Sequence, residues 1–548
     1  MFDKRASGVL AHPTSFPSSY GVGDLGAGAY AFVDFLAEAG QTLWQILPLG
    51  PTGFGDSPYQ SFSAFAGNPL LISPDLLADA GWLSHKGDLS NALTFDQHNV
   101  DYGPVIEAKT VLYEKAYWRF VAEADAEEKK KFDRFCNKHK SWLEDYALFV
   151  AIKSALINER REEWESAGLK DYAEQMKKYL SPDQVKDYYY GAAWSSWPSA
   201  LAKRESAALK DMAEKLKDAV ALVKFLQYTF FMQWNALKKY ANKKNIRIIG
   251  DIPIFVAQDS ADVWSRPDLY CLNDKGWPTA VAGVPPDYFS ETGQLWGNPL
   301  YDWPAHKKEN YAWWCKRTES VLDLVDIVRI DHFRGFEAYW AVPAGEPTAV
   351  KGKWIKGPGK PLFDALKKHI SALRKADAKK DFVLPIIAED LGLITEKVDK
   401  LRIDFALPGM KILQFCFAID GASDYIPHNY TSNQTVVYSG THDNDTTVGW
   451  YTSVGEPEKD YLRRYLNVSG DDVAWDLIRL AFASVGIFAI VPLQDIFSLD
   501  THARMNLPGQ ACGWWKWRYT QGALTSDYAK RLKYLGELYH RNAKQLGK

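Results

Sequence analysis

The chain has 548 residues, and its 65 lysines and arginines nearly balance its 68 aspartates and glutamates, for a formal net charge of -3. This balance gives no reason to expect nucleic acid or a membrane surface as a partner. The five cysteines are scattered without a CxxC pair, which favours free thiols in a reducing compartment over disulfides or a zinc site. With no signal peptide and no apolar run of about 18 residues, we expect a cytoplasmic protein, or a plastid protein if a transit peptide has been removed.

Eight short apolar runs predict β-strands, and helical segments lie between them. Most of the runs are continuous rather than alternating and are rich in Val, Ile and Leu, as in parallel strands buried on both faces. Apolar side chains recur at helical spacing in residues 27–39, 225–241 and 362–374. The alternation predicts a (β/α)8 TIM barrel, and we interpret residues 1–548 as one catalytic domain of this fold. The predicted strands are residues 8–10, 42–49, 246–256, 324–332, 383–390, 410–415, 435–440 and 487–493.

Two connections between these strands are too long for plain barrel loops, so we expect them to be insertions. Residues from about 70 to 240 are rich in Lys, Glu and Ala and predict a mainly helical subdomain. Within it, Ser181-Pro182-Asp183-Gln184 has the sequence of a helix start, and residues 159–178 predict a solvated, charged helix without a function. The second insertion, about residues 253–303, is rich in Gly, Pro, Trp and Asp and predicts an active-site lid with little secondary structure.

Three carboxylates each follow one of the predicted barrel strands: Asp331, Glu389 and Asp443. Active sites of such barrels lie at the carboxyl ends of the strands, so we expect the three to meet in one pocket. Neighbouring strands are about 4.8 Å apart, so Asp331 and Glu389 should have carboxyl groups roughly 5–5.5 Å apart. This is the separation of a retaining glycosidase, in which one carboxylate attacks the anomeric carbon while the other protonates the leaving oxygen.

Sequence neighbours predict different roles for the two carboxyl groups. Arg329 precedes Asp331 by two residues and should lower its pKa, which keeps a nucleophile ionised. Glu389 has no adjacent cation, so the charge of Asp331 should raise its pKa, as a general acid needs. A single Asp at a strand end could equally well be a helix N-cap, but three such residues favour catalysis. His332 and His442 could donate hydrogen bonds to sugar hydroxyls, although either alone would more often be structural.

Several longer motifs, together with the three acidic segments, make the chain resemble a known family over nearly its whole length. They include Ser57-Pro58-Tyr59-Gln60-Ser61, Gly250-Asp251-Ile252-Pro253-Ile254, Pro408-Gly409-Met410-Lys411 and Arg504-Met505-Asn506-Leu507-Pro508-Gly509. The chain resembles the 4-α-glucanotransferases of the amylomaltase, or disproportionating-enzyme, type in glycoside hydrolase family 77. The helical insertion beyond Tyr102 resembles this family only in patches, such as Trp194-Ser195-Ser196-Trp197-Pro198.

The resemblance implies a role for each site residue. Asp331 would be the nucleophile, Glu389 the acid/base and Asp443 the transition-state stabiliser. The residues implied to bind substrate are Tyr59, Asp251, Trp296, Arg329, His332 and His442, with a lid around Tyr288 and Trp296 closing over the glucan. The implied reaction is a retaining transfer of an α-1,4-glucan segment to the 4-hydroxyl of another glucan or of glucose. Malto-oligosaccharides and α-1,4-glucans would be the partners of a monomer or weak homodimer, with no cofactor and no metal.

Two departures and two alternatives accompany this interpretation. The chain departs from the usual family pattern at Leu499-Asp500-Thr501-His502 and at Trp514. These departures concern the rim near the last strand and not the three carboxylates.

A hydrolase of the α-amylase type would use the same carboxylates, but many such enzymes carry calcium and a C-terminal β domain, for which residues 494–548 are too few. A catalytically inactive barrel that binds glucan is the other alternative, and the presence of all three carboxylates argues against it.

Overall fold

Eight parallel strands form the centre of the molecule. The computed structural model describes residues 2–90, 94–167, 193–286, 290–376, 382–418, 423–510 and 512–541. The strands follow one another around the sheet in the order β10-β11-β12-β1-β2-β3-β6-β9. They are β1 (Ala6–Leu10), β2 (Leu43–Gln45), β3 (Arg247–Ile252), β6 (Ile327–Ile330), β9 (Ile386–Ala388), β10 (Gly409–Ile412), β11 (Thr435–Tyr438) and β12 (Phe488–Pro492). The sheet closes between its two edge strands, β9 and β10. The Ala388 N–H of β9 donates over 2.9 Å to the carbonyl of Pro408, which directly precedes β10.

The structure therefore confirms a (β/α)8 barrel, and each predicted run overlaps one of its strands. The strands are buried on both faces, which explains their continuous apolar sequences. Close packing also requires glycine at one point, because a Cβ on Gly8 would lie 2.1 Å from the Leu43 carbonyl oxygen of the neighbouring strand. Several strands end earlier than predicted, because the chain leaves the sheet at their carboxyl ends and continues into loops.

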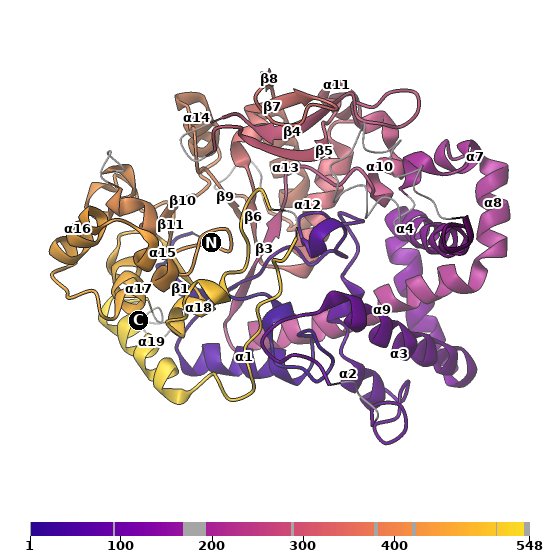
Figure 1. The fold of residues 1–548 in the computed structure, drawn as a ribbon, viewed down its shortest axis with the longest axis horizontal. Coiled ribbons are helices and arrows are strands. Elements are labelled where there is room, and N and C mark those ends of the chain that lie inside the picture. Colours follow the sequence, from indigo (N-terminus) through magenta and orange to yellow (C-terminus); the bar gives the residue numbers. More distant parts are fainter. Residues whose placement is uncertain are drawn as a thin grey trace.

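Helices surround this barrel (Figure 1). The three predicted helices are confirmed as α1 (Ala27–Glu38), the end of α9 (Lys217–Lys243) and α13 (Lys360–Leu373). The other helices outside the long connections are α12 (Ala312–Leu324), α14 (Glu396–Asp404), α15 (Thr447–Ser453), α16 (Glu456–Leu466), α17 (Val473–Ala483), α18 (Leu493–Ile496) and α19 (Ser526–Leu538). In the described part of the chain, no helix has the length and apolar character needed to cross a membrane.

The first long connection is mainly helical where the structure describes it. Its helices are α2 (Pro74–Asp79), α3 (Tyr102–Glu123), α4 (Ala126–Ala167), α7 (Ser199–Ala202), α8 (Ser206–Lys215) and most of α9. The buried Lys153 of α4 forms an ion pair with Asp259, which follows β3, and so joins this part to the barrel. The predicted charged helix at 159–178 overlaps the end of α4, but its part beyond residue 167 lies outside the described residues, as does the predicted helix start at 181–184.

The prediction of little secondary structure in residues 253–303 is wrong. This stretch contains α10 (Ala261–Ser265), β4 (Ala280–Val284) and β5 (Gln294–Pro299), and α11 (Trp303–Lys308) begins at its end. The two strands join an antiparallel sheet of order β5-β4-β7-β8 with β7 (Ala338–Pro343) and β8 (Lys353–Lys356). This sheet lies at the top of Figure 1. Its partners come from a different barrel connection, so no local pattern indicated the pairing. The division of the chain into one barrel with two insertions stays a prediction.

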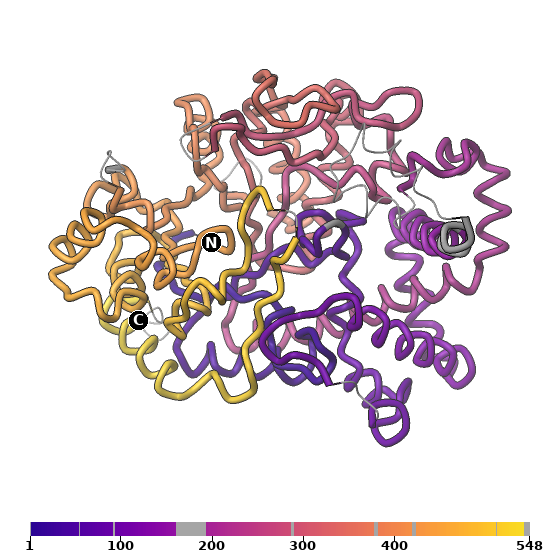
Figure 2. Tube along the Cα trace, in the orientation of Figure 1, coloured from indigo at the N-terminus to yellow at the C-terminus, as the bar shows by residue number. Residues whose placement is uncertain are grey.

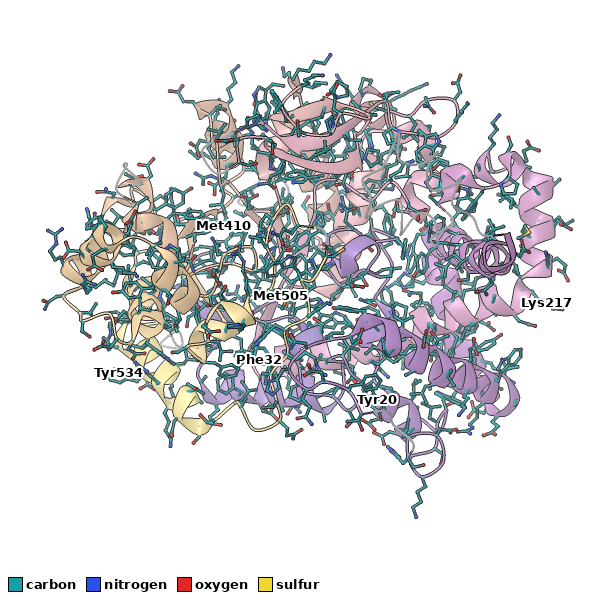
Figure 3. The ribbon with its side chains drawn as sticks, in the orientation of Figure 1. Tyr20, Phe32, Lys217, Met410, Met505 and Tyr534 are labelled. Atoms are coloured by element: carbon teal, nitrogen blue, oxygen red, sulfur yellow. The ribbon has the colours of Figure 1, made fainter. Side chains whose placement is uncertain are left out.

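The C-terminal segment before α19 crosses the N-terminal part of the chain (Figure 2). The Val100 N–H donates to the Lys516 carbonyl over 2.8 Å, and the Tyr102 hydroxyl donates to the Trp515 carbonyl over 2.9 Å. Met505, on the same segment, lies near the middle of the view in Figure 3 and is buried. The crossing thereby brings Asn506 and Trp515 to the carboxyl ends of the barrel strands.

Candidate active site

Asp331 and Glu389 directly follow the neighbouring strands β6 and β9. The backbone joins them closely: the N–H of His332 donates to Oε2 of Glu389 over 2.7 Å, and the Leu391 N–H donates to Oε1 over 2.8 Å. His332 has a φ of 51°, in the left-handed region that residues other than glycine seldom adopt. Such strained turns persist where the surroundings fix them, and here the turn after Asp331 is fixed by Glu389.

The Arg329 guanidinium lies between two carboxylates. Its Nη1 is 2.5 Å from Oδ2 of Asp251, and its Nη2 is 2.9 Å from Oδ1 of Asp331. The strand register explains the first contact, because Asp251 of β3 lies opposite Arg329 of β6. The third nitrogen, Nε, contacts the sulfur of Met410 at 3.4 Å. The buried Arg329 guanidinium therefore contacts two carboxylates. The side chain of Asp251 is fully buried, whereas that of Asp331 is 28% exposed.

The expected pKa of Asp331 is wrong in direction. Burial raises the pKa of Asp331 to about 8, and this effect outweighs the lowering by Arg329. The charges of Asp251, Glu389 and Asp443 raise it further, and Arg329 is shared with Asp251, which it approaches more closely. For Glu389 the expected direction is right but the expected cause is not: burial, helped by the charge of Asp390, raises its pKa against Arg329 and two backbone N–H donors. Asp331 and Glu389 together therefore retain a proton near neutral pH, as the raised pKa of Asp331 requires.

Asp443 lies on the loop after β11, a strand that is separated from β9 by β10 alone. The Asn506 side chain donates from Nδ2 to Oδ1 of Asp443 over 2.6 Å, and Arg504 donates to the Asp443 carbonyl over 2.7 Å. Nε2 of His442 lies 3.4 Å from Oδ2 of Asp443. Because the charge of Asp443 also acts on the pKa of Asp331, the three predicted carboxylates share one electrostatic environment.

Two aromatic residues contact the histidines of the site. Tyr59 donates from its hydroxyl to Oδ2 of Asp251 over 2.8 Å, and its ring stacks on His442 with centroids 5.1 Å apart. Trp296 of β5 meets His332 edge to face with centroids 4.8 Å apart. The structure thus connects all six predicted substrate-binding residues to the three carboxylates, either directly or through another residue of the six. Tyr288, the other lid residue, lies outside the described residues.

Three buried polar atoms in this cluster find no hydrogen-bond partner among the described residues. They are Oδ1 of Asp251, Nε2 of His332 and Nδ1 of His442. Burial lowers the pKa of His332 to about 3 and also lowers that of His442, so both imidazoles are neutral near pH 7. A neutral imidazole can donate one hydrogen bond and accept another. Buried groups of this kind cost stability unless they are paired, which suits a ligand rich in hydroxyl groups.

Sequence reasoning assigned no role to Asn506, Arg504 or Trp515. Asn506 and Arg504 lie in a recognised motif, but their contact with Asp443 spans about 60 residues and had no local signal. Trp515 has a φ of 66° and packs with centroids 5.8 Å from Tyr59 and 5.9 Å from His442. A left-handed conformation at a large aromatic residue is rare, and only the fold reveals it.

Comparisons with known proteins agree over nearly the whole chain. A family model described as Glyco_hydro_77, 4-alpha-glucanotransferase, matches residues 11–525. A 4-alpha-glucanotransferase of Synechocystis sp. is 47% identical over 543 residues, covering 99% of each chain. One of Thermus thermophilus is 45% identical, covering 98% of this chain and 99% of its own. An amylomaltase from Streptococcus agalactiae, solved in complex with acarbose, is 38% identical with a TM-score of 0.86, covering 98% of this chain and 100% of that one.

Proposed function

Since the chain belongs to glycoside hydrolase family 77, the 4-alpha-glucanotransferases, we propose that Asp331, Glu389 and Asp443 carry out its retaining transfer of α-1,4-glucan segments. One observation supports this assignment most strongly. The two carboxyl groups that the reaction needs follow adjacent strands and are joined through the His332 N–H. A retaining reaction requires such close carboxyl groups.

In the first half of the reaction, a carboxylate oxygen of Asp331 attacks the anomeric carbon of the donor glucan. The bond to the glycosidic oxygen breaks, and Glu389 gives that oxygen its proton, so that one glucan fragment leaves with a free 4-hydroxyl. The other fragment remains as an ester on Asp331. Burial favours the protonated form of Asp331, but the attack needs its ionised form, so the proton must be on Glu389 when the attack begins. Arg329, 2.9 Å from Asp331, favours the negative charge there.

In the second half, the 4-hydroxyl of an acceptor glucan attacks the anomeric carbon of this ester. Glu389, now ionised, takes the hydroxyl proton, and the bond to Asp331 breaks. Both steps build positive charge on the sugar ring. Asp443, oriented by Asn506 and Arg504, would stabilise that charge.

The remaining site residues would orient the donor sugars. Asp251 and the neutral His332 and His442 each present an unpaired polar atom that a sugar hydroxyl can satisfy. Tyr59 and Trp296 add aromatic surface next to the two histidines.

Transfer requires that a sugar hydroxyl compete with water for the ester. The lid assigned to residues 253–303 carries Trp296 on β5, which contacts His332 directly after the nucleophile. Closure of this lid over a bound acceptor would exclude water and use binding energy that water cannot supply. We further propose that malto-oligosaccharides are its substrates and that it acts in the cytoplasm as a monomer or weak homodimer, which light scattering during gel filtration would test.

The products formed from maltotriose test the proposed reaction. Transfer yields glucose together with a ladder of longer glucans, while the number of reducing ends stays constant. A net gain of reducing ends without longer chains would show hydrolysis and contradict the proposal. Asp331→Asn is the matched control, because it keeps the side-chain shape and removes the nucleophile.

A further inference from the structure

Asp495 is a buried carboxylate outside the proposed catalytic group. It lies in α18, directly after β12, and is 1% exposed. Its Oδ2 accepts hydrogen bonds from the hydroxyls of Ser439 at 2.6 Å and Thr447 at 2.8 Å. Its Oδ1 accepts the backbone N–H of Thr447 at 2.8 Å. Both oxygens are therefore engaged by two residues that are eight positions apart in the chain.

Those two residues enclose the loop that carries Asp443. Ser439 directly follows β11, and Thr447 is the first residue of α15. The residues between them, 440–446, include His442 and Asp443. A single carboxylate from a third element thus holds both ends of the loop at a fixed separation.

Other contacts organise the interior of this loop. Oδ1 of Asn444 accepts from the N–H and the hydroxyl of Thr441, at 2.9 and 2.8 Å. Gln414 donates to the Asp445 carbonyl over 2.9 Å, and Thr501 donates to the Asp445 carboxylate over 2.8 Å. These bonds shape the loop, whereas the bonds to Asp495 set where the shaped loop begins and ends.

We propose that Asp495 is a positioning residue, which holds the loop so that Asp443 faces the reacting sugar. The inference rests on the proposed role of Asp443. Catalytic groups need placement within a fraction of an ångström, and an error of about 1 Å can cost roughly 100-fold in rate. In the described part of the chain, the hydrogen bonds of Asp495 go to Ser439 and Thr447 and not to a predicted site residue, so its effect would pass through the loop.

The hydrogen bonds of Asp495 allow a conservative replacement. In Asp495→Asn the amide oxygen can accept the Thr447 N–H, while the amide nitrogen, with two hydrogens, replaces Oδ2. The hydroxyls of Ser439 and Thr447 can rotate to accept from it. Burial also raises the pKa of Asp495, so a neutral side chain suits the site. In Asp495→Ala, by contrast, the Thr447 N–H and both hydroxyls lose their partner.

The first measurement compares kcat and KM for these two variants with maltotriose. We expect Asp495→Ala to lower kcat roughly 10- to 100-fold with little change in KM. Asp495→Asn should keep kcat within about threefold, because its hydrogen bonds preserve the loop ends. The control is Asp88→Ala in the helical connection, which removes a carboxylate that accepts from Ser84 N–H and Arg119 without contact to a predicted site residue. If Asp495→Ala kept full kcat, the inference would be wrong.

A double-mutant cycle separates positioning from a general loss of structure. In an Asp443→Asn background there is no carboxylate left to position, so Asp495→Ala should cost less than about threefold there. Residual rates can be followed with an α-maltosyl fluoride donor, whose leaving group needs no acid. An equal loss in both backgrounds would overturn the inference while leaving the proposed function intact. Full activity of Asp443→Asn alone would instead overturn the role of Asp443, and the inference with it. If Asp495→Ala does not fold, Thr447→Val and Ser439→Ala test the same bonds singly, with the same non-additivity expected.

Discussion

The backbone N–H of His332 donates to Oε2 of Glu389 over 2.7 Å. This bond connects the residue after the proposed nucleophile, Asp331, with the proposed acid/base across two adjacent strand ends. The relative position of the two carboxyl groups therefore depends on backbone geometry more than on free side-chain rotation. Preorganisation of this kind places catalytic groups without further ordering during the reaction.

Glu389→Gln should lower kcat for maltotriose by roughly 10²- to 10⁴-fold, because the amide cannot protonate the leaving oxygen. A donor with a fluoride leaving group should restore the first half of the reaction, since fluoride needs no proton. The rate of the first turnover with each donor checks this, because later turnovers also need Glu389 as the base of the second half. A first turnover slowed by the same factor with both donors would contradict the acid role.

Tyr59→Phe should lower kcat/KM for maltotriose by roughly 10- to 100-fold. The change removes the hydroxyl that donates to Asp251 but keeps the ring that stacks on His442. A hydrogen bond to a charged group contributes about 1.5–3 kcal/mol, which corresponds to this range. Steady-state kinetics with maltotriose check the expectation, and an unchanged kcat/KM would refute it. Tyr240→Phe is a control, because its hydroxyl donates to an exposed carboxylate, Asp34, on the surface.

Asn506→Asp should lower kcat by about 10²-fold or more, because it replaces a donor to Asp443 with a second carboxylate. At a separation of 2.6 Å the two oxygens would share a proton or separate, and either outcome disturbs the stabilising charge. Rates measured from pH 5 to 8 check this. If the variant kept its rate across this range, the proposed dependence of Asp443 on Asn506 would be wrong.

Asp331→Asn should gain stability relative to the natural chain as pH rises. The folded pKa of Asp331 is about 8, above the ordinary value of about 3.9, so the folded chain keeps a proton that the unfolded chain releases. The contribution of Asp331 to stability is therefore present below pH 4 and is lost as pH rises through about 8.

Asparagine does not titrate, so the difference in free energy of unfolding should grow in favour of the variant between pH 4 and 8. Urea denaturation of both proteins across this range measures it. A constant difference would show that the pKa of Asp331 is not raised in the folded state.

The barrel could be predicted because its strands are buried on both faces, which leaves continuous apolar runs in the sequence. Asp331 and Glu389 lie at the ends of two such runs that are consecutive barrel strands, so the sequence predicts that they are neighbours. The sheet formed by β4, β5, β7 and β8 could not be predicted, because its strands come from two separate connections and pair only in the fold.

The electrostatics of the site were predictable only in part. The sequence places Arg329 beside Asp331, but it does not show that Asp251 shares the same guanidinium at 2.5 Å. Nor does it show how strongly burial acts on the pKa of Asp331. The contact of Asn506 with Asp443 was likewise hidden, since it depends on how the C-terminal segment crosses the molecule.

The formation of a covalent bond to Asp331 is the most direct test of the proposed mechanism. In Glu389→Gln supplied with α-maltosyl fluoride, the first half of the reaction proceeds while the second half lacks its base. Intact-protein mass spectrometry followed by peptide mapping should then find one maltosyl group attached to Asp331. A maltosyl group on another residue, or release of sugar without any adduct, would contradict the mechanism.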